Sequence, residues 1–478
     1  MPRLTGFPPA PIPGPRALPF IGVHANVIRI VADPIARLLA MRREHGDVVA
    51  AAGGSPAVVC AFGGERNREV LSNTNTFEND SDFFFKLPPD SNAKKVINGI
   101  VFQPGEVARQ RRRLMMPAFQ KTAMDGYSGD IVSVTRASLD RWPVGVTADV
   151  AALTRDLVER IAVLCFLGVE QQGGERTLGR LFDALSELTV HPLTLALPFQ
   201  LPGTPYSKLL DVGDRMVHYF ADLFEKKRSA PDLGRDALAL MMAAKDEDNG
   251  RKLSDDELVG EAVTLFFAGH DTQAKTLAWT IFLLEQHPHV LADLLDELDS
   301  VLRGADPTPA DIPRLPLLDR VIKESMRLLS PAPLLFMRVC QSEARLGQYT
   351  LPSGAGVLLS PFVTHREPSL YADPARFRPE RWETASPTIY EYLPFGAGPR
   401  MCIGAGFATL ALRLMLPMIL QRFRLSLAHG ARISYRFRGN ILGPEHGVPM
   451  LIAPQDRRIA RQTTLRGNIG TIVDLPSS

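Results

Sequence analysis

Apolar residues recur at helical spacing along most of the chain up to about residue 330. This periodicity predicts amphipathic helices, because residues three or four positions apart share one helix face. The expected helices cover residues 34–45, 105–119, 151–167, 178–188, 208–227, 236–244, 319–329 and 407–420. Short apolar runs between glycines and prolines predict strands at 48–52, 57–62, 347–351 and 356–360. The pattern indicates a mainly α fold with small β-sheets, of the α+β class.

The two ends of the chain differ in composition from its middle. Prolines occupy seven of the first 20 positions, which favours an extended arm over residues 1–22. Residues 455–478 form a polar tail to which the sequence assigns no role. Neither a repeat nor a change of composition divides the part between them, so we expect one large domain over residues 23–454.

The longest expected helix begins after Ser254 and ends before Pro288. Ser254 and Glu257 have the spacing of a capping box, in which each side chain bonds the backbone N–H of the other residue. The middle of this helix reads Ala268-Gly269-His270-Asp271-Thr272. Glycine, aspartate and threonine are weak helix formers. A local departure of this kind inside a well-capped helix is typical of a functional site.

Composition and charge narrow the class of protein. The chain has 478 residues, of which 45% are hydrophobic and 22% charged, as in ordinary globular proteins. Its formal charge of +2 gives no general attraction to nucleic acid. Neither a signal peptide nor a run of 18 apolar residues is apparent, so we expect a cytoplasmic protein without a transmembrane anchor. The four cysteines lie far apart, which is typical of a reducing compartment.

Cys402 lies in an unusual segment, Phe395-Gly396-Ala397-Gly398-Pro399-Arg400-Met401-Cys402-Ile403-Gly404. Glycines allow the backbone to approach a flat or bulky group closely. Arg400 and the start of the following helix would both favour a thiolate. Taken alone, the segment leaves two interpretations of Cys402 open, a metal-binding thiolate and a small buried hydrophobic residue.

Glu324 and Arg327 are spaced to form an ion pair on one helix face. Arg381, in the loop Pro379-Glu380-Arg381-Trp382, is a candidate third partner. Taken singly, these residues suit a surface salt bridge and a solvated basic loop, which contribute little to stability. The apolar neighbours of Glu324 favour partial burial instead.

The order and spacing of these motifs resemble the cytochrome P450 family, particularly its soluble bacterial members. The family has an oxygen-binding helix, a Glu-x-x-Arg pair, a Pro-Glu-Arg loop and a cysteine loop, and the cysteine loop here matches at every fixed position. The resemblance implies a single large P450-type fold, with the catalytic domain over residues 23–454. It implies haem b (iron protoporphyrin IX) as the cofactor, with Cys402 as the thiolate ligand of the iron. Phe395 would pack near the sulfur, and Gly404 would let the helix approach the porphyrin.

By the same resemblance, Asp271 and Thr272 lie on the oxygen side of the haem. Ala268 and Gly269 would open a groove for O2, the co-substrate. Reduced dioxygen must be protonated before its bond breaks, so a hydroxyl and a carboxylate would form a suitable relay. The alternative is that Asp271 and Thr272 only satisfy the helix backbone.

The haem propionates need cationic partners, and the resemblance assigns this role to Arg112, Arg338 and Arg400. Ala108 stands where the family usually has Trp or His, so one propionate contact is absent or replaced. Two interpretations of the remaining arginines near Arg112 stay open. They are either a solvated face or a docking patch for an acidic electron-transfer partner.

The family's substrate-wall positions are apolar in this chain, which predicts a lipophilic substrate such as a fatty acid, terpenoid, steroid or polyketide. The expected wall residues are Phe85, Phe102, Leu265, Phe266, Leu334, Leu335 and Phe336. Each also suits ordinary packing. Prolines between 192 and 205 predict a mobile lid.

The expected activity is therefore that of a haem-thiolate monooxygenase, which hydroxylates or epoxidises its substrate. The chain leaves no room for a fused flavin reductase, so we expect a separate ferredoxin or flavodoxin-type donor with an NAD(P)H-dependent reductase. The alternatives are a haem-thiolate peroxygenase or isomerase, and a non-catalytic haem carrier or sensor. A third interpretation takes Gly404-Ala405-Gly406 as a dinucleotide fingerprint, but no strand precedes it and no acidic ribose partner follows.

Overall fold

Helices account for 52% of the described residues, in line with the mainly α fold that the periodicity predicted. The computed structural model describes residues 6–17, 22–79, 87–169, 177–189, 191, 193–194, 199–438 and 441–476. The chain divides into two compact units. The helical unit comprises Asn79–Val134 and Val158–Asp271. The mixed unit comprises Arg3–Glu78, Thr135–Leu157 and Thr272–Ser478.

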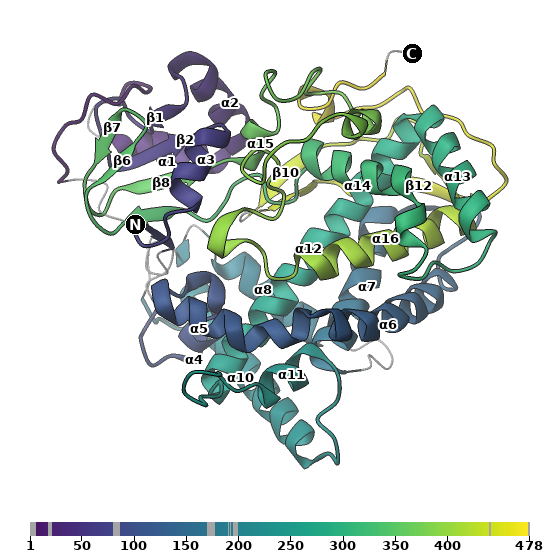
Figure 1. Cartoon of the computed structure of the whole chain (residues 1–478), viewed down its shortest axis with the longest axis horizontal. Helices are drawn as coiled ribbons and strands as arrows, with labels where there is room; N and C mark the ends of the chain where they lie inside the picture. Colours follow the sequence, from purple (N-terminus) through teal and green to yellow (C-terminus); the bar gives the residue numbers. More distant parts are fainter. Residues whose placement is uncertain are drawn as a thin grey trace. The chain divides into compact units, whose positions relative to one another are not determined.

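The helical unit is built around α10, a long helix capped by the Thr204 side chain. Its elements are α4 (Asn92–Val96), η1 (Ile100–Phe102), α5 (Gly105–Met115), η2 (Met116–Phe119), the π-helical turn η3 (Val163–Leu167), α8 (Thr177–Thr189), α10 (Pro205–Ser229) and α11 (Ala237–Ala243). Helix α10 packs against α4 and α8 (Figure 1). At Gly213 a Cβ would lie 2.5 Å from the Cα of Ala93, so glycine allows α4 to approach α10 this closely.

Three helices have a part in each unit: α6 (Lys121–Leu139), α7 (Val150–Ala162) and α12 (Asp255–Gln286). The capping box of α12 is confirmed, because Ser254 N donates to Glu257 Oε2 at 2.9 Å and Glu257 N donates to Ser254 Oγ at 3.3 Å. The helix runs without a break through the 268–272 motif. Within the described parts of the chain, no helix is both long and apolar enough to cross a membrane.

The main sheet of the mixed unit joins strands from both ends of the chain, in the order β1-β2-β8-β5-β3. These strands are β1 (Val48–Ala50), β2 (Val58–Ala61), β3 (Phe77–Asn79), β5 (Arg338–Cys340) and β8 (Gly356–Leu359). Strands β2 and β8 pair in parallel, with Cys60 opposite Leu358, and lie side by side in purple and green in Figure 1. Every residue of both strands is buried, which explains their continuous apolar sequences.

Within the residues that the structure describes, three smaller sheets contain the remaining named strands. They are β4-β12-β9 (Thr147–Asp149, Pro449–Pro454 and Phe423–Leu427), the pair β6-β7 (Ala344–Leu346 and Tyr349–Leu351) and the pair β10-β11 (Tyr435–Arg438 and Ile441–Pro444). The helical elements of the mixed unit are α1 (Val23–Ala32), α2 (Pro34–His45), α3 (Gly64–Leu71), α13 (Pro288–Leu302), η4 (Ile312–Arg314), α14 (Pro316–Leu328), α15 (Pro361–Thr364), η5 (Pro379–Glu383), η6 (Gly398–Arg400), α16 (Ala405–Arg422) and η7 (Ile469–Thr471). Helix α16 packs against α13 and α14.

Both terminal segments are attached to the mixed unit by backbone hydrogen bonds. In the arm, Ala50 N donates to Pro13 O at 2.8 Å and Gly53 N donates to Pro15 O at 2.9 Å. In the tail, Gln462 N donates to the buried carboxylate of Glu285 at 3.0 Å, and Ile433 N donates to Arg466 O at 2.7 Å. The tail also buries Ile469, Ile472 and Val473. The polar tail is therefore a packed part of the unit.

The periodicity did not reveal α6 and α13. Helix α6 contains Gly126, Gly129 and several Ser and Thr residues, so its intrinsic helix propensity is weak. Helix α13 begins with Pro288 at its first turn, where the missing N–H and the fixed φ are both acceptable. The same proline that ends α12 therefore starts the next helix.

Candidate active site

The cysteine segment folds into a loop between η6 and α16. Cys402 N donates to Phe395 O at 2.9 Å, and this bond joins the two ends of the loop. Gly398 has a φ of 72°, and a Cβ there would lie 2.2 Å from Leu71 O. Only glycine fits at this position. The third glycine, Gly404, caps α16, so the cysteine precedes a helix N-terminus as the sequence predicted.

Cys402 differs from the other cysteines in exposure. Cys60, Cys165 and Cys340 are buried, whereas Cys402 is exposed. Burial raises the pKa of Cys60 and of Cys340 to about 12, which keeps these thiols neutral and inert. The sulfur of Cys402 is therefore the one that is accessible to a ligand, and the interpretation as a buried hydrophobic residue is wrong.

Arg338, on β5, carries a buried charge that has no counter-ion in the described part of the chain. Its side chain is 5% exposed, and among the described residues its Nε and Nη1 have no hydrogen-bond partner. Burial, with a smaller contribution from Arg400, lowers the pKa of Arg338 to about 10. A buried guanidinium beside a second arginine is unfavourable unless an anion binds there. Both arginines belong to the mixed unit, as does Cys402.

The middle of α12 has one open face, with buried positions on either side of it along the helix. Phe267 and Ala268 are exposed, and Asp271 and Thr272, one turn further on, are partly buried. Phe266 is instead fully buried, and its ring lies 4.2 Å from that of Phe182. Phe266, an expected wall residue, therefore does not lie on the open face. Its neighbour Phe267, which is 38% exposed, lies there instead.

Gly269 is required by packing. A Cβ at Gly269 would lie 2.4 Å from Cε2 of Phe166, which comes from the π-helical turn η3. Glycine therefore allows an aromatic ring to contact the helix backbone directly. Packing against Phe166 alone accounts for a glycine at position 269. The role of Gly269 in an oxygen groove stays a prediction.

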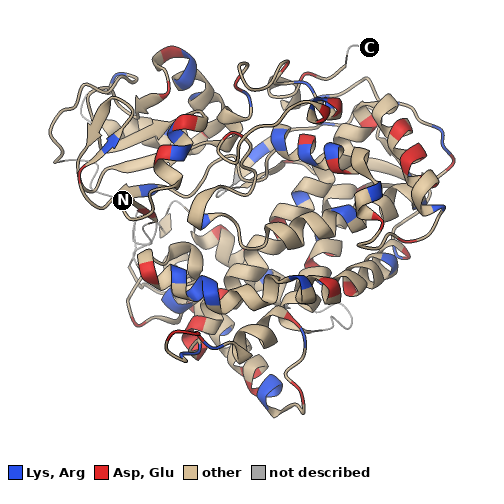
Figure 2. Ribbon diagram, viewed as in Figure 1, with Lys and Arg blue, Asp and Glu red and all other residues tan. Residues whose placement is uncertain are grey.

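The arginines of α5 are mostly paired with acidic side chains, and Figure 2 shows basic and acidic segments next to each other there. Arg109 bonds Glu106 at 2.8 Å, and Arg113 bonds Asp246 at 3.0 Å. Arg111 is buried and bonds Glu261 at 3.1 Å. These three arginine charges are matched within the helical unit, so they are poor candidates for attracting an acidic electron-transfer partner. The binding of a haem propionate by Arg112 stays a prediction.

Glu324 and Arg327, on α14, form a fully buried ion pair, so the surface interpretation is wrong. Two nitrogens of Arg327 donate to the carboxylate at 2.8 and 2.9 Å. Arg381 Nε donates to Glu324 Oε1 at 2.9 Å, and Trp382 Nε1 donates to Oε2 at 3.0 Å. Arg327 Nη1 also donates to the carbonyls of His365 and Pro374. We call these residues, Glu324, Arg327, Arg381 and Trp382, the Glu324 network.

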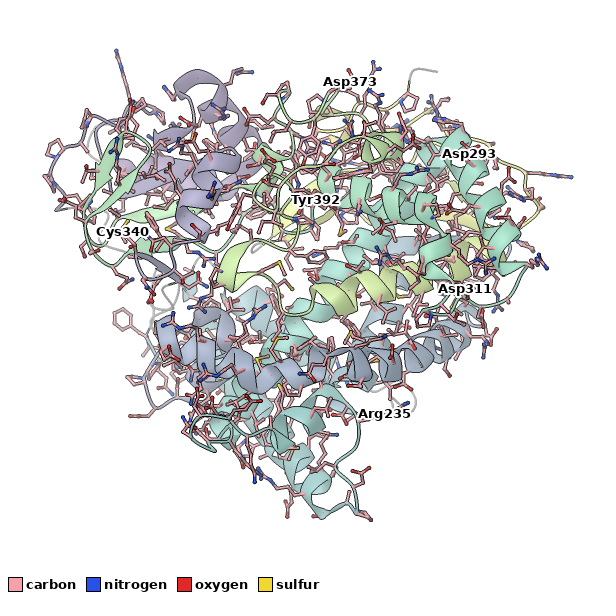
Figure 3. The ribbon with its side chains drawn as sticks, in the orientation of Figure 1. Arg235, Asp293, Asp311, Cys340, Asp373 and Tyr392 are labelled. Carbon is pink, nitrogen blue, oxygen red and sulfur yellow. The ribbon has the colours of Figure 1, made fainter. Side chains whose placement is uncertain are left out.

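An aromatic cluster joins this network to the cysteine loop. Tyr392, labelled in Figure 3, lies 4.6 Å from the ring of Trp382 and 5.4 Å from that of His365. Leu393 N donates to His365 Nε2 at 3.0 Å, so Nδ1 carries the proton and donates to Arg327 O at 3.3 Å. His365 therefore holds the chain two residues before Phe395.

The expected apolar walls are placed unevenly. Phe85 lies outside the described residues, as does part of the expected lid. Leu265 and Leu334 are buried, Phe102 is partly buried and Phe336 is 38% exposed. Leu335 Cδ2 lies 3.9 Å from the position of a Cβ at Gly396, which places it beside the cysteine loop. Their contact with a substrate stays a prediction.

A model of the cytochrome P450 family matches residues 12–448. The chain is 31% identical over 432 residues to cyclooctat-9-en-7-ol 5-monooxygenase of Streptomyces melanosporofaciens, covering 88% of this chain and 90% of that protein. It is 30% identical over 425 residues to pentalenene oxygenase of Streptomyces avermitilis, covering 88% and 92%. The chain therefore belongs to the cytochrome P450 family and is a P450 monooxygenase.

Solved structures show the same fold. The haem domain of cytochrome P450DA superposes with a TM-score of 0.81 at 24% identity, covering 94% of this chain and 99% of that one. A cyanobacterial P450, CYP120A1, with retinoic acid bound superposes with a TM-score of 0.80 at 23% identity, covering 94% and 100%.

Members of this family hold a haem iron through a cysteine thiolate and use O2. The mixed unit suits such a group in two ways. Its exposed cysteine suits a soft metal ligand, and the buried charge of Arg338 suits a carboxylate.

The Glu324 network should respond differently to two conservative substitutions. In Glu324→Gln, the donors that now bond two carboxylate oxygens have a single acceptor oxygen, and the buried arginine charge is unmatched. We therefore expect the free energy of unfolding to fall by roughly 3–5 kcal/mol, or the protein to fail to fold. Trp382→Phe removes one hydrogen bond, for about 1–2 kcal/mol. Thermal melting and soluble yield would measure both. Equal losses in the two variants would show that the carboxylate has no special role.

His365 should make the protein less stable in mild acid. Burial, with Arg327 and Arg366, lowers the pKa of His365 from 6.5 to about 3, so the unfolded chain binds the extra proton first. Stability is therefore full above pH 6.5 and is lost as the pH falls towards 3, with about 2 kcal/mol lost between pH 7.5 and 5. Urea unfolding at the two pH values should show this loss in the wild type and a smaller loss in His365→Gln. An unchanged pH dependence in the variant would contradict the assignment.

Proposed function

We propose that this protein is a haem-thiolate monooxygenase that uses O2 and two electrons from a separate donor to hydroxylate or epoxidise a lipophilic small molecule. The observation that carries the proposal is the buried guanidinium of Arg338, which has no counter-ion among the described residues and whose charge a haem propionate would match. When bound, haem b would supply the redox-active iron at which O2 is reduced. Cys402 would hold the iron, and Arg400 and Arg112 would assist Arg338 with the propionates.

The loop geometry supports this role of Cys402. The bond from Cys402 N to Phe395 O and the glycine required at position 398 fix the loop before any ligand binds. A preformed loop reduces the entropy lost when the cofactor binds. Phe395 would shield the sulfur side of the loop, and Gly404, the N-cap of α16, would let the helix approach the cofactor without a side chain in the way.

Asp271 and Thr272 would move the protons that oxygen reduction requires. Both lie on the open face of α12, where a carboxylate can exchange protons with water and a hydroxyl can pass one on. Ala268, one turn before Thr272, leaves that face uncrowded.

A terpenoid is the substrate class that we propose. The relatives named above act on cyclooctat-9-en-7-ol and pentalenene, and cyclooctatin synthase is a further relative at 30% identity. Phe267, Leu335 and Phe336 would present apolar surface to such a molecule. A ferredoxin or flavodoxin-type protein with an NAD(P)H-dependent reductase would supply the electrons in the cytoplasm.

Cys402→Ser should abolish the thiolate-type Soret band of the reduced protein with carbon monoxide, because serine offers no thiolate. The wild type and Cys60→Ala, which removes a buried thiol from β2, should keep the band. A band that survives in Cys402→Ser, or that is missing from the wild type, would refute the assignment of the ligand and the cofactor.

Thr272→Ala should keep haem and substrate binding but divert electrons from product to hydrogen peroxide. We expect the product formed per NAD(P)H to fall by roughly 10-fold or more, because the proton donor is lost. Thr276→Ala is the matched control, since the Thr276 hydroxyl donates to Thr272 O at 2.9 Å and is buried. Equal coupling in the wild type and Thr272→Ala would exclude the relay role.

A further inference from the structure

Glu261 is a buried carboxylate of α12 to which the proposed chemistry assigns no role. Its side chain has no exposed surface. Each of its oxygens accepts one bond from a different segment of the helical unit. Oε2 accepts from Ile100 N at 3.0 Å, and Oε1 accepts from Arg111 Nη1 at 3.1 Å. One carboxylate thus joins α12, α5 and the turn η1.

Two glycines bring this turn into direct contact with α12. A Cβ at Gly99 would lie 1.8 Å from Thr264 Oγ1 and 2.6 Å from Gly260 O. A Cβ at Gly260 would lie 2.9 Å from the carbonyl carbon of Asn98. Neither position has room for a side chain, so the backbone at residues 98–100 lies directly on the helix surface.

Hydrogen bonds from several side chains hold the rest of the segment. Gln103 Nε2 donates to Asn98 O at 3.0 Å and to Asn98 Oδ1 at 2.7 Å. Arg111 Nη1 also donates to Asn98 O, and Asn79 Nδ2 donates to Val101 O at 2.7 Å. The bond from Ile100 N to Glu261 differs from these bonds, because its acceptor is a side chain of α12.

We infer that Glu261 is a positioning residue for substrate selection, which fixes the backbone of Ile100 and thereby the side chains that Ile100–Phe102 present to the substrate. The inference rests on the proposed function and on the sequence-based expectation that Phe102 belongs to the substrate wall. Because α12 also carries Asp271 and Thr272, Glu261 sets the spacing between the wall segment and the helix of the proton relay. Glu261 touches neither substrate nor cofactor in this role.

The charge state of Glu261 gives the contact a pH dependence. Burial raises the pKa of Glu261 to about 7, although Ile100 N–H and Arg111 both oppose the rise. Among the described residues, the charged groups that face it are Arg111 from α5 and Glu257 from α12. Because the carboxyl pKa is raised in the folded protein, the contact between Glu261 and the Ile100 backbone is most stable at low pH. This stabilisation is lost as the pH rises through 7. The segment should therefore loosen as the pH rises from mildly acidic to neutral.

Hydrogen exchange of the haem-loaded protein tests the contact directly. In the wild type, the protection factor of the Ile100 amide, corrected for intrinsic exchange, should fall about 10-fold between pH 6 and pH 8. In Glu261→Leu it should be lower by roughly 10-fold at pH 6 and independent of pH, because the acceptor is gone. Glu257→Gln also removes a carboxylate beside Arg111 but leaves the acceptor of Ile100 N in place, so it should keep a protected, pH-dependent amide. Its midpoint should move to lower pH, because the charge of Glu257 helps to raise the pKa of Glu261. A wild type with pH-independent protection would overturn the inference without any variant.

Spectral titration with pentalenene and cyclooctat-9-en-7-ol tests selection. Glu261→Leu should change the ratio of the two dissociation constants by roughly 10-fold and leave the carbon monoxide band intact. Lower protection with an unchanged ratio would overturn the selection role and leave Glu261 a structural residue. A wild type that binds neither probe would overturn selection among terpenoids. Failure of the proposed function would be seen separately, as a missing thiolate band in the wild type.

Discussion

Glu324 has no exposed surface, so its negative charge must be matched inside the mixed unit. Arg327, Arg381, Trp382 and the backbone N–H of Arg378 together supply five hydrogen bonds to its two oxygens. Arg327 and Arg381 then use their other nitrogens on backbone carbonyls between residues 365 and 376. A long irregular stretch of chain between α15 and η5 is thereby held by side-chain charge, where it has no helix or strand to satisfy its backbone.

The position of Cys402 depends on this network through a short series of contacts. Arg327 fixes the carbonyl of His365, and the ring of His365 fixes the backbone of Leu393. Phe395 follows two residues later, and its carbonyl accepts the N–H of Cys402. A buried ion pair is costly to form. Here the buried ion pair helps to fix the conformation of the loop that carries the Cys402 thiol, which its glycines would otherwise leave flexible.

The sequence predicted the elements whose signals are local. Helical spacing identified α2, α10 and α14, and the Ser254 capping box identified the start of α12. Features that depend on tertiary partners could not be found in this way. Whether Phe266 or Phe267 faces outward is decided by Phe182, and the absence of a side chain at Gly269 is decided by Phe166. That the described residues offer Arg338 no counter-ion becomes visible only once its neighbours in the fold are known.

The packed tail places a condition on the order in which the mixed unit can form. Glu285 accepts from Gln462 N, Arg366 donates to the carbonyl of Ile472, and Ile433 donates to that of Arg466. Each of these three groups is translated before the tail residue that satisfies it. On a ribosome, the unit that carries Cys402 must therefore wait with buried polar groups incomplete until residues 462–472 have emerged. Its final packing must therefore follow the synthesis of this segment, and a nascent chain stalled before residue 462 would leave these groups open to solvent and to chaperones.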